Sequence, residues 1–210
     1  EDLEKFIEAS KNINDLPLYI DETPAIKIST LANRARRIKR LHGLDLIVVD
    51  YIQLMTTGNF KYEGRVQEIG EITQGLKALA KELNIPILAL SQLSRAVETR
   101  KESKMPQLSD LRESGAIEQD ADMVMFIYRP EYYEVMSNEM GESTQGETLI
   151  RIAKHRNGRL DLIKLRANLD IQKFEEWEGD SPIPGLASNY KPLQAGSNSG
   201  DTPDGGRFFI

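Results

Sequence analysis

The spacing of apolar residues predicts an amphipathic helix near the start of the chain. Ser29 or Thr30 is placed to cap its first turn, and Gly43 is placed to end it. The apolar positions at helical spacing are Leu31, Ala35, Ile38 and Leu41. The opposite face is either a solvated surface or a contact with another subunit or DNA, and its cations are Arg34, Arg36, Arg37, Lys39 and Arg40.

A second and longer amphipathic helix is predicted further along the chain. Its apolar positions are Val66, Ile69, Ile72, Leu76, Leu79 and Leu83. Gly70 and Gly75 interrupt this pattern, and we interpret them as minor weaknesses of the helix.

Short and almost continuously apolar runs lie between and after the helices. They span residues 44–50, 87–91 and 123–128, and a shorter run at 18–21 also resembles a strand. Continuous apolar runs are typical of parallel strands that are buried on both faces. Such strands separated by helices predict an α/β fold, with a mostly parallel sheet flanked by helices and right-handed crossovers.

The pattern changes after residue 147. Three further strands are predicted at 149–156, 160–165 and 171–174, and Asn157-Gly158 indicates a tight hairpin between the first two. Antiparallel strands are therefore expected at the C-terminal end of the sheet. From Gly179 onward Gly, Pro, Ser and Asn dominate, so we divide the chain into a domain over 1–178 and a flexible tail over 179–210.

Composition narrows the class of protein. The 210 residues suffice for one α/β domain, and the absence of cysteine excludes disulfides and thiolate metal sites. A net charge of −6 disfavours a protein that coats DNA with its whole surface, so any nucleic-acid contact should involve a local loop. No apolar run approaches the roughly 20 residues that span a bilayer. Without a signal pattern or an initiator Met, the chain is expected to be a fragment of a longer protein.

Two polar residues follow predicted neighbouring strands. Asp50 ends the first buried strand and Gln92 follows the second, at the edge where open α/β sheets bind ligands. A carboxylate there can hold Mg²⁺ through water, and an amide can sense a phosphate or position water. The alternative is that both residues are ordinary polar strand ends.

Two cations are predicted to share a face of a strand. Lys154 and Arg156 lie two residues apart, so both side chains should point the same way, whereas His155 should point away and have no role. Such a pair can reach a phosphate across a subunit boundary, as an arginine finger does. The alternative is that the cations protect a strand edge from aggregation.

The polar stretch over 109–122 precedes the third buried strand. It contains Arg112, Glu113 and Gly115, and a loop with a cation and exposed backbone N–H groups can follow a phosphate backbone. From these residues alone, an exposed polar loop remains the simpler interpretation.

Together these segments resemble the DnaB-type replicative helicases. The resemblance covers about residues 16–177 and rests on four blocks that occur in the family's order and spacing. The first, Asp50-Tyr51-Ile52-Gln53-Leu54-Met55, resembles the Walker B segment, and the second, residues 76–83 followed by 89–93, resembles the next block of the family. Residues 109–122 resemble its DNA-loop motif, and Lys154-His155-Arg156-Asn157-Gly158 resembles its trans-acting motif.

The resemblance implies a RecA-like ATPase fold that assembles as a homo-hexamer around single-stranded DNA in the cytoplasm, at the nucleoid. ATP and Mg²⁺ are the implied cofactors, and a primase and a helicase loader are implied partners. Asp50 would hold Mg²⁺, and Gln92 would couple the nucleotide state to the DNA loops. Arg112, Glu113 and Gly115 would contact DNA, and Lys154 and Arg156 would reach the ATP of the adjacent subunit.

One departure from the family pattern is large. The phosphate-binding loop G-x-x-x-x-G-K-[ST] does not occur in these 210 residues, nor is there a match for the glutamate that activates water. We therefore expect no measurable ATP hydrolysis by this chain alone. A RecA-like or KaiC-like ring ATPase and a non-catalytic ring-assembly module remain as alternatives.

Overall fold

The structure is a computed structural model that describes residues 16–58, 64–101, 103–111, 115–138 and 141–177, together with Leu3, Lys5 and Ile7. Helices and strands are mixed along these residues, as the predicted α/β class requires. In chain order the elements are α2 (Ile28–His42), β1 (Ile47–Val49), η1 (Ile52–Leu54), α3 (Arg65–Leu83), β2 (Ile87–Ala89), α4 (Ala96–Thr99), η2 (Leu108–Asp110), α5 (Gly115–Asp120), β3 (Met123–Tyr128), η3 (Pro130–Tyr133), β4 (Glu147–His155), β5 (Asp161–Asn168) and β6 (Lys173–Glu176).

Helix α2 forms where its apolar spacing predicts it. Its end is confirmed, because Gly43 has a φ of 83° and its N–H donates to the carbonyl of Lys39 at 3.2 Å. Its predicted cap is wrong. The helix already begins at Ile28, with Lys27 in the N-cap position and no side-chain cap, so Ser29 and Thr30 lie inside the first turn.

The long helix α3 is confirmed over the predicted span, and its buried side includes Ile69, Ile72 and Leu76. Gly75 has a packing role rather than being a weakness. A Cβ atom at this position would lie 2.6 Å from Cγ1 of Ile28. The missing side chain therefore allows the start of α2 to pack closely against α3.

The cations of α2 contact acidic and carbonyl groups of the same chain. Arg34 pairs with Asp21, Arg36 pairs with Glu82 through two nitrogens at 2.6 and 2.7 Å, and Lys39 donates to the carbonyl of Leu83. The pair with Glu82 raises the pKa of Arg36 and lowers that of Glu82. These contacts favour a structural role for the three cations.

Strands β1 and β2 form a parallel pair in which Ile47 lies opposite Ile87. β1 is shorter than the predicted run, and Val48 is 55% exposed, so the prediction of burial on both faces is wrong for this strand. The strand predicted at 18–21 does not form, and Leu18 and Ile20 are exposed. Apolar composition alone therefore overstated how much of this sheet is covered.

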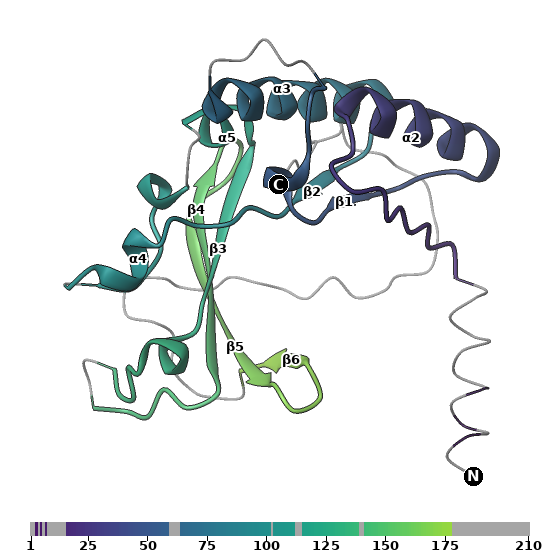
Figure 1. Ribbon diagram of the computed structural model, residues 1–210. Helices are drawn as coiled ribbons and strands as arrows, with labels where there is room; N and C mark the ends of the chain where they lie inside the picture. The colour runs from purple at the N-terminus through teal and green to yellow at the C-terminus, as the bar shows by residue number, and fades with distance from the viewer. Residues whose placement is uncertain are drawn as a thin grey trace.

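Strand β3 joins a different sheet from β2. It pairs with β4 in antiparallel fashion, and β5 and β6 follow in the order β3-β4-β5-β6. The C-terminal antiparallel strands are thus confirmed, but the described residues contain two separate sheets instead of one mostly parallel sheet. Figure 1 shows α2 and α3 along the parallel pair, and the long β3–β4 ribbon carrying β5 and β6 away from it.

The predicted hairpin between β4 and β5 is present, but its turn is not tight. The connection spans residues 156–160, longer than the two-residue turn that Asn157-Gly158 indicates. The imidazole of His155 leaves no room for a side chain at position 158, because a Cβ on Gly158 would lie 2.2 Å from the ring. β6 begins two residues later than the predicted 171–174.

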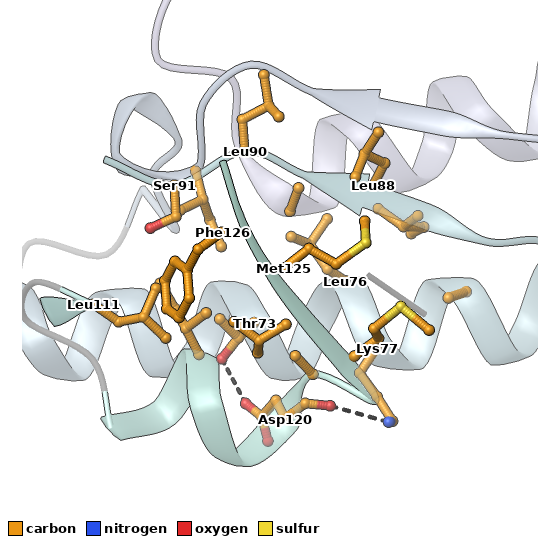
Figure 2. A pocket seen from close by; sticks show the side chains of 18 of the residues that line it. Thr73, Leu76, Lys77, Leu88, Leu90, Ser91, Leu111, Asp120, Met125 and Phe126 are labelled. Atoms are coloured by element: carbon orange, nitrogen blue, oxygen red, sulfur yellow. Dashed lines mark hydrogen bonds between the residues drawn. The ribbon is translucent and has the colours of Figure 1, made fainter. Parts of the chain in front are cut away.

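An apolar slot separates the two sheets. It has a volume of about 430 Å³, with β2 along one wall and β3 along the other. Figure 2 shows Leu88 of β2 and Met125 of β3 at the slot, with Thr73, Leu76 and Lys77 of α3 beneath them. Within the described part of the chain, β2 pairs only with β1 and β3 only with β4, so each presents an unpaired edge to the slot.

Candidate functional site

Asp50 lies directly after β1, as predicted, and its side chain is exposed. It lines a groove of about 980 Å³ formed by α2, β1 and residues 19–26. Because its side chain is exposed and lines the groove, the Asp50 carboxylate is available to a ligand there.

Gln92 lies at the same edge of the parallel pair, which the sequence predicted from the parallel strands. Its backbone N–H donates to Oε1 of Gln53 at 3.2 Å. The amide nitrogen of Gln53 in turn donates to Oγ of Ser91 at 2.9 Å. Gln53 therefore joins the segment after β1, which carries Asp50, to the segment after β2, which carries Gln92.

The segment that carries Gln53 is held by the first turn of α3. Arg65 donates to the carbonyls of Gln53 and Met55 at 2.7 and 3.0 Å, and it also pairs with Glu68. Burial acts to raise the pKa of Glu68, but hydrogen bonds from Thr56, Thr57 and Arg65 outweigh it, so the pKa falls below its usual value. A charged carboxylate thus fixes the loop after η1.

The residues at this edge are suited to a Mg²⁺ ion that is bound jointly with phosphate. Mg²⁺ usually keeps several waters and takes only one or two carboxylates beside substrate oxygens. One exposed carboxylate next to a groove matches that pattern. Across the residues that the structure describes, no group of three or more His, Cys, Asp or Glu side chains could form an all-protein metal cage.

Lys154 and Arg156 point to the same side, as their spacing predicted. Both donate to the carbonyl of Gln119, Arg156 at 2.6 Å and Lys154 at 3.4 Å, and Lys154 also donates to the carbonyl of Glu118. Burial and then the neighbouring charge of Arg156 lower the pKa of Lys154. The guanidinium remains accessible, with 47% of the Arg156 side chain exposed.

The structure does not bring the four predicted residues into one place. Asp50 and Gln92 follow strands of the parallel pair, whereas Lys154 lies near the end of β4, Arg156 follows directly after β4, and both contact α5. A division of this kind is what a site shared between two subunits requires, because each chain then supplies a different half.

The predicted DNA segment is described only in part. Arg112 and Glu113 lie outside the described residues, and Gly115 begins α5. The flanks are ordered by local contacts. Asp110 is 3% exposed and pairs with Arg100, and Leu111 forms a bridge with Leu93.

The interpretation of 109–122 as a simple polar loop is wrong for its described part. Residues 108–110 form η2, where Asp110 accepts from the N–H of Gln107 at 2.8 Å, and residues 115–120 form α5. Local side-chain capping and a short helix therefore replace the expected irregular loop on either side of residues 112–114.

Sequence reasoning missed three residues that organise these groups: Gln53, Arg65 and Asp122. Each makes its contacts with residues far along the chain or with backbone carbonyls, for which a sequence pattern has no signal. The acidic run Asp120-Ala121-Asp122 next to a buried strand was the only visible hint of the third.

Among the described residues, none of the helices combines the length and the apolar character that crossing a membrane requires.

Similar proteins were found by sequence. The replicative DNA helicase DnaB of Rickettsia prowazekii (strain Madrid E) is 52% identical over 181 aligned residues, which cover 80% of this chain and 37% of that protein. The DnaB of Geobacillus stearothermophilus is 43% identical over 180 residues, covering 85% of this chain and 38% of that protein. This chain thus spans less than two fifths of the length of these curated relatives.

Solved structures agree with the sequence relatives. A DnaB-like replicative helicase, described together with its interactions with primase, matches with a TM-score of 0.75 and 34% identity over 85% of this chain and 42% of that one. A second solved structure, described as an ATPase domain, matches with a TM-score of 0.76 and 34% identity, over 85% of this chain and 61% of that one. At 34% identity, both solved structures resemble this chain in sequence as well as in the arrangement of strands and helices.

A family model gives the same result over most of the chain. The model of the DnaB-like helicase C-terminal domain matches residues 1–176, which include Asp50, Gln92, Lys154 and Arg156. With the relatives above, this match favours the DnaB-type prediction over the RecA-like or KaiC-like alternative. The chain belongs to the DnaB-like helicase C-terminal domain family.

Proposed function

We propose that this chain is part of a replicative DNA helicase motor that hydrolyses ATP between subunits of a hexameric ring and moves along single-stranded DNA. The observation that carries the proposal is the placement of Lys154 and Arg156. Lys154 near the end of β4 and Arg156 just after it donate to the same carbonyl of Gln119, on a different sheet from the strands that Asp50 and Gln92 follow. A ring of such chains would bring the two cations of one subunit to the Asp50 edge of the next.

In this proposal each half of the shared site has a defined task. Asp50 would hold Mg²⁺ beside the phosphates of ATP, and Gln92, tied to Gln53, would respond to the terminal phosphate. Lys154 and Arg156 of the adjacent subunit would neutralise the charge that develops on the transferred phosphoryl group. The segment with Arg112, Glu113 and Gly115 would contact the DNA backbone.

We also infer that a further β-strand completes the sheet in the RecA-like manner. The unpaired edges of β2 and β3 face each other across an apolar slot, and an inserted strand would satisfy both edges and join the two sheets. The segment that carries the phosphate-binding loop in this family is the occupant we propose. We also propose a primase and a helicase loader as partners, and one solved relative is described with its interactions with primase.

The test is ATP turnover by the complete polypeptide in which these residues occur, with and without single-stranded DNA. Arg156→Ala should abolish DNA-stimulated turnover and leave ATP binding intact, because the guanidinium acts on a neighbour's nucleotide. Arg159→Ala, on the same hairpin connection, is the matched control. Arg159 pairs with Asp161 at the surface, so its loss should leave turnover unchanged.

The outcomes separate the alternatives. Loss of ATP binding in Arg156→Ala would contradict the proposal that this arginine acts on the nucleotide of the adjacent subunit. Turnover that does not respond to DNA would argue against a DNA-tracking motor. A complete polypeptide without turnover would instead support the non-catalytic assembly module.

A further inference from the structure

The C-terminal turn of α5 collects three cations. The carbonyls of its last three residues accept hydrogen bonds from side chains of other elements: Glu118 from Lys154, Gln119 from Arg156, and Asp120 from Lys77 at 3.0 Å. Helix ends leave such carbonyls without intrahelical partners, and cations stabilise them there. Both proposed trans-acting cations are therefore anchored to α5 within their own chain.

Asp122 lies at the centre of this group, two residues after α5. Its Oδ1 is 2.5 Å from Nζ of Lys77 and 3.4 Å from Nη1 of Arg156. The side chain is only 14% exposed, and its Oδ2 is buried with no hydrogen-bond partner among the described residues. The backbone N–H of Arg156 also donates to the carbonyl of Asp122 at 2.9 Å. The carboxylate thus faces the arginine from a fixed position.

Asp122 lies among several cationic side chains, whose mutual repulsion its carboxylate reduces. Lys77 of α3, Lys154 of β4 and Arg156 just after β4 all approach the end of α5, where Glu118 of α5 itself also lies. Burial and the charge of Arg156 lower the pKa of Lys154, whereas Glu118 and Asp122 act in the opposite direction. Without the Asp122 carboxylate, less negative charge would offset the repulsion between Lys154 and Arg156.

The anchor is tied to the body of the protein and to the predicted DNA segment. Oγ1 of Thr73 in α3 donates to the carboxylate of Asp120 at 2.5 Å, and Figure 2 shows this bond beside the one from Lys77. At its other end, α5 begins at Gly115, shortly after Arg112 and Glu113 in the sequence. The same short helix therefore connects the predicted DNA segment to the carbonyls that hold Lys154 and Arg156.

We infer that Asp122 is a positioning residue, which sets the direction of Arg156 and Lys154 toward the nucleotide of the adjacent subunit. This inference rests on the proposed trans role of the two cations. A guanidinium carries five N–H donors, and Asp122 and Gln119 engage its two terminal nitrogens. Further donors stay available to phosphate oxygens while the side chain is held in place.

The test compares ATP turnover by rings of the complete polypeptide at saturating single-stranded DNA. Asp122→Asn keeps the size of the side chain but removes its charge. It should lower kcat about tenfold, the scale on which small misplacements of a catalytic group act, and leave KM for ATP unchanged within about twofold. Asp161→Asn, which removes the acidic partner of Arg159 on the same hairpin, should leave kcat unchanged.

Mixed rings distinguish positioning from a general structural effect. Asp50→Ala subunits have a defective nucleotide site but intact cations, whereas Asp122→Asn subunits have the reverse. Their mixture should turn over more ATP than the average of the two separate proteins, because some interfaces then combine two intact halves. A misfolded Asp122→Asn subunit would not give this recovery.

Further variants keep the inference separate from the proposed function. The mixture of Arg156→Ala with Asp50→Ala subunits should recover turnover in the same way, and its failure would contradict the trans role itself. If that mixture recovers but Asp122→Asn keeps the original kcat, the inference about Asp122 is wrong. Should Asp122→Asn not fold, Asp122→Glu replaces it. An unchanged kcat in that variant would overturn the inference, and a reduced kcat with an unchanged KM would support it.

Discussion

The two sheets of this protein are stabilised by different kinds of contact. The parallel pair with α2 and α3 shares a cluster of fourteen buried apolar residues, whereas the cluster beside β3 contains three. The antiparallel sheet also has a buried ion pair between two of its strands, Lys164 with Glu147, and Lys77 of α3 pairs with Asp122 just before β3. The proposed trans-acting cations belong to this second region.

The difference suggests a division of labour. Close apolar packing is rigid and tolerates little change, whereas hydrogen bonds and ion pairs hold side chains through their polar atoms and keep those atoms at the site. The parallel region can therefore hold Asp50 and Gln92 in fixed positions. The antiparallel region holds Lys154 and Arg156 by hydrogen bonds and an ion pair, which leave further donors available to a phosphate.

The largest expected difference in unfolding free energy is between two isoleucine-to-alanine variants, one in each region. Ile72→Ala should lower the free energy of unfolding of this chain by about 3 kcal/mol, because the side chain is fully buried in the large cluster. Ile127→Ala, at a position 63% exposed at the slot, should cost less than about 0.5 kcal/mol. Urea denaturation of both variants measures the contrast.

The Ile127→Ala variant also tests whether a further strand fills the slot. In the complete polypeptide the cost of Ile127→Ala should rise above about 1 kcal/mol, because the inserted strand would cover this side chain. An equal and small cost of Ile127→Ala in both contexts would mean that the slot stays open.

A smaller effect is expected from the charged contacts of the antiparallel sheet. Lys164 lies 3.9 Å from the centre of the Trp177 ring and 3.1 Å from Oε2 of Glu147, which is 7% exposed. Lys164→Met should cost about 2 kcal/mol, because it leaves this buried carboxylate without its counter-charge.

The matched control for Lys164→Met is on the next strand. Lys173→Met removes an ion pair with Glu175 whose two side chains are 58% and 45% exposed, so it should cost less than about 0.5 kcal/mol. Thermal or urea unfolding of the two variants provides the measurement. Equal effects would indicate that burial does not control the strength of these pairs.

The smallest effect is expected at the exposed pair of Asp21 with Arg34 beside the parallel region. Hydrogen bonds from Arg34 and then Thr23 lower the pKa of Asp21 to about 2. Because the folded-state pKa lies below the unfolded value of 3.8, the stabilisation is present above that pH and is lost as the pH falls through about 2. Solvent screening keeps it below about 1 kcal/mol.

Urea unfolding of the original chain and Asp21→Asn at pH 7, 5 and 3 measures this contribution. The difference between the two proteins should be constant from pH 7 to 5 and smaller at pH 3. A difference that grows toward low pH would contradict the assigned direction of the pKa. The neighbouring exposed Glu22→Gln is the control.

Sequence patterns predicted the features that depend on residues close together along the chain. The apolar spacing of α3, the end of α2 at Gly43 and the common side of Lys154 and Arg156 all follow from local geometry. The edge shared by Asp50 and Gln92 was also predictable, because the carboxyl ends of parallel strands meet at one edge of a sheet.

What the sequence did not predict depends on contacts between distant segments. β3 has the same apolar character as β2, so nothing in its composition indicates that it pairs with β4 alone among the described strands. Gly75 counts as a weakness until Ile28 is seen against it. The contacts of Gln53 with Ser91, and of Asp122 with Lys77, join residues far apart along the chain.

The facing edges of β2 and β3 also bear on how the chain behaves at high concentration. Neither strand carries a charged residue, and lysine or proline at an edge is the usual protection against pairing with another molecule. β3, with six residues, offers a longer template for such pairing than the three-residue β2. Prepared by itself, this polypeptide should therefore self-associate through added strands as its concentration rises. A lysine introduced into the exposed edge of β3 would improve its solubility.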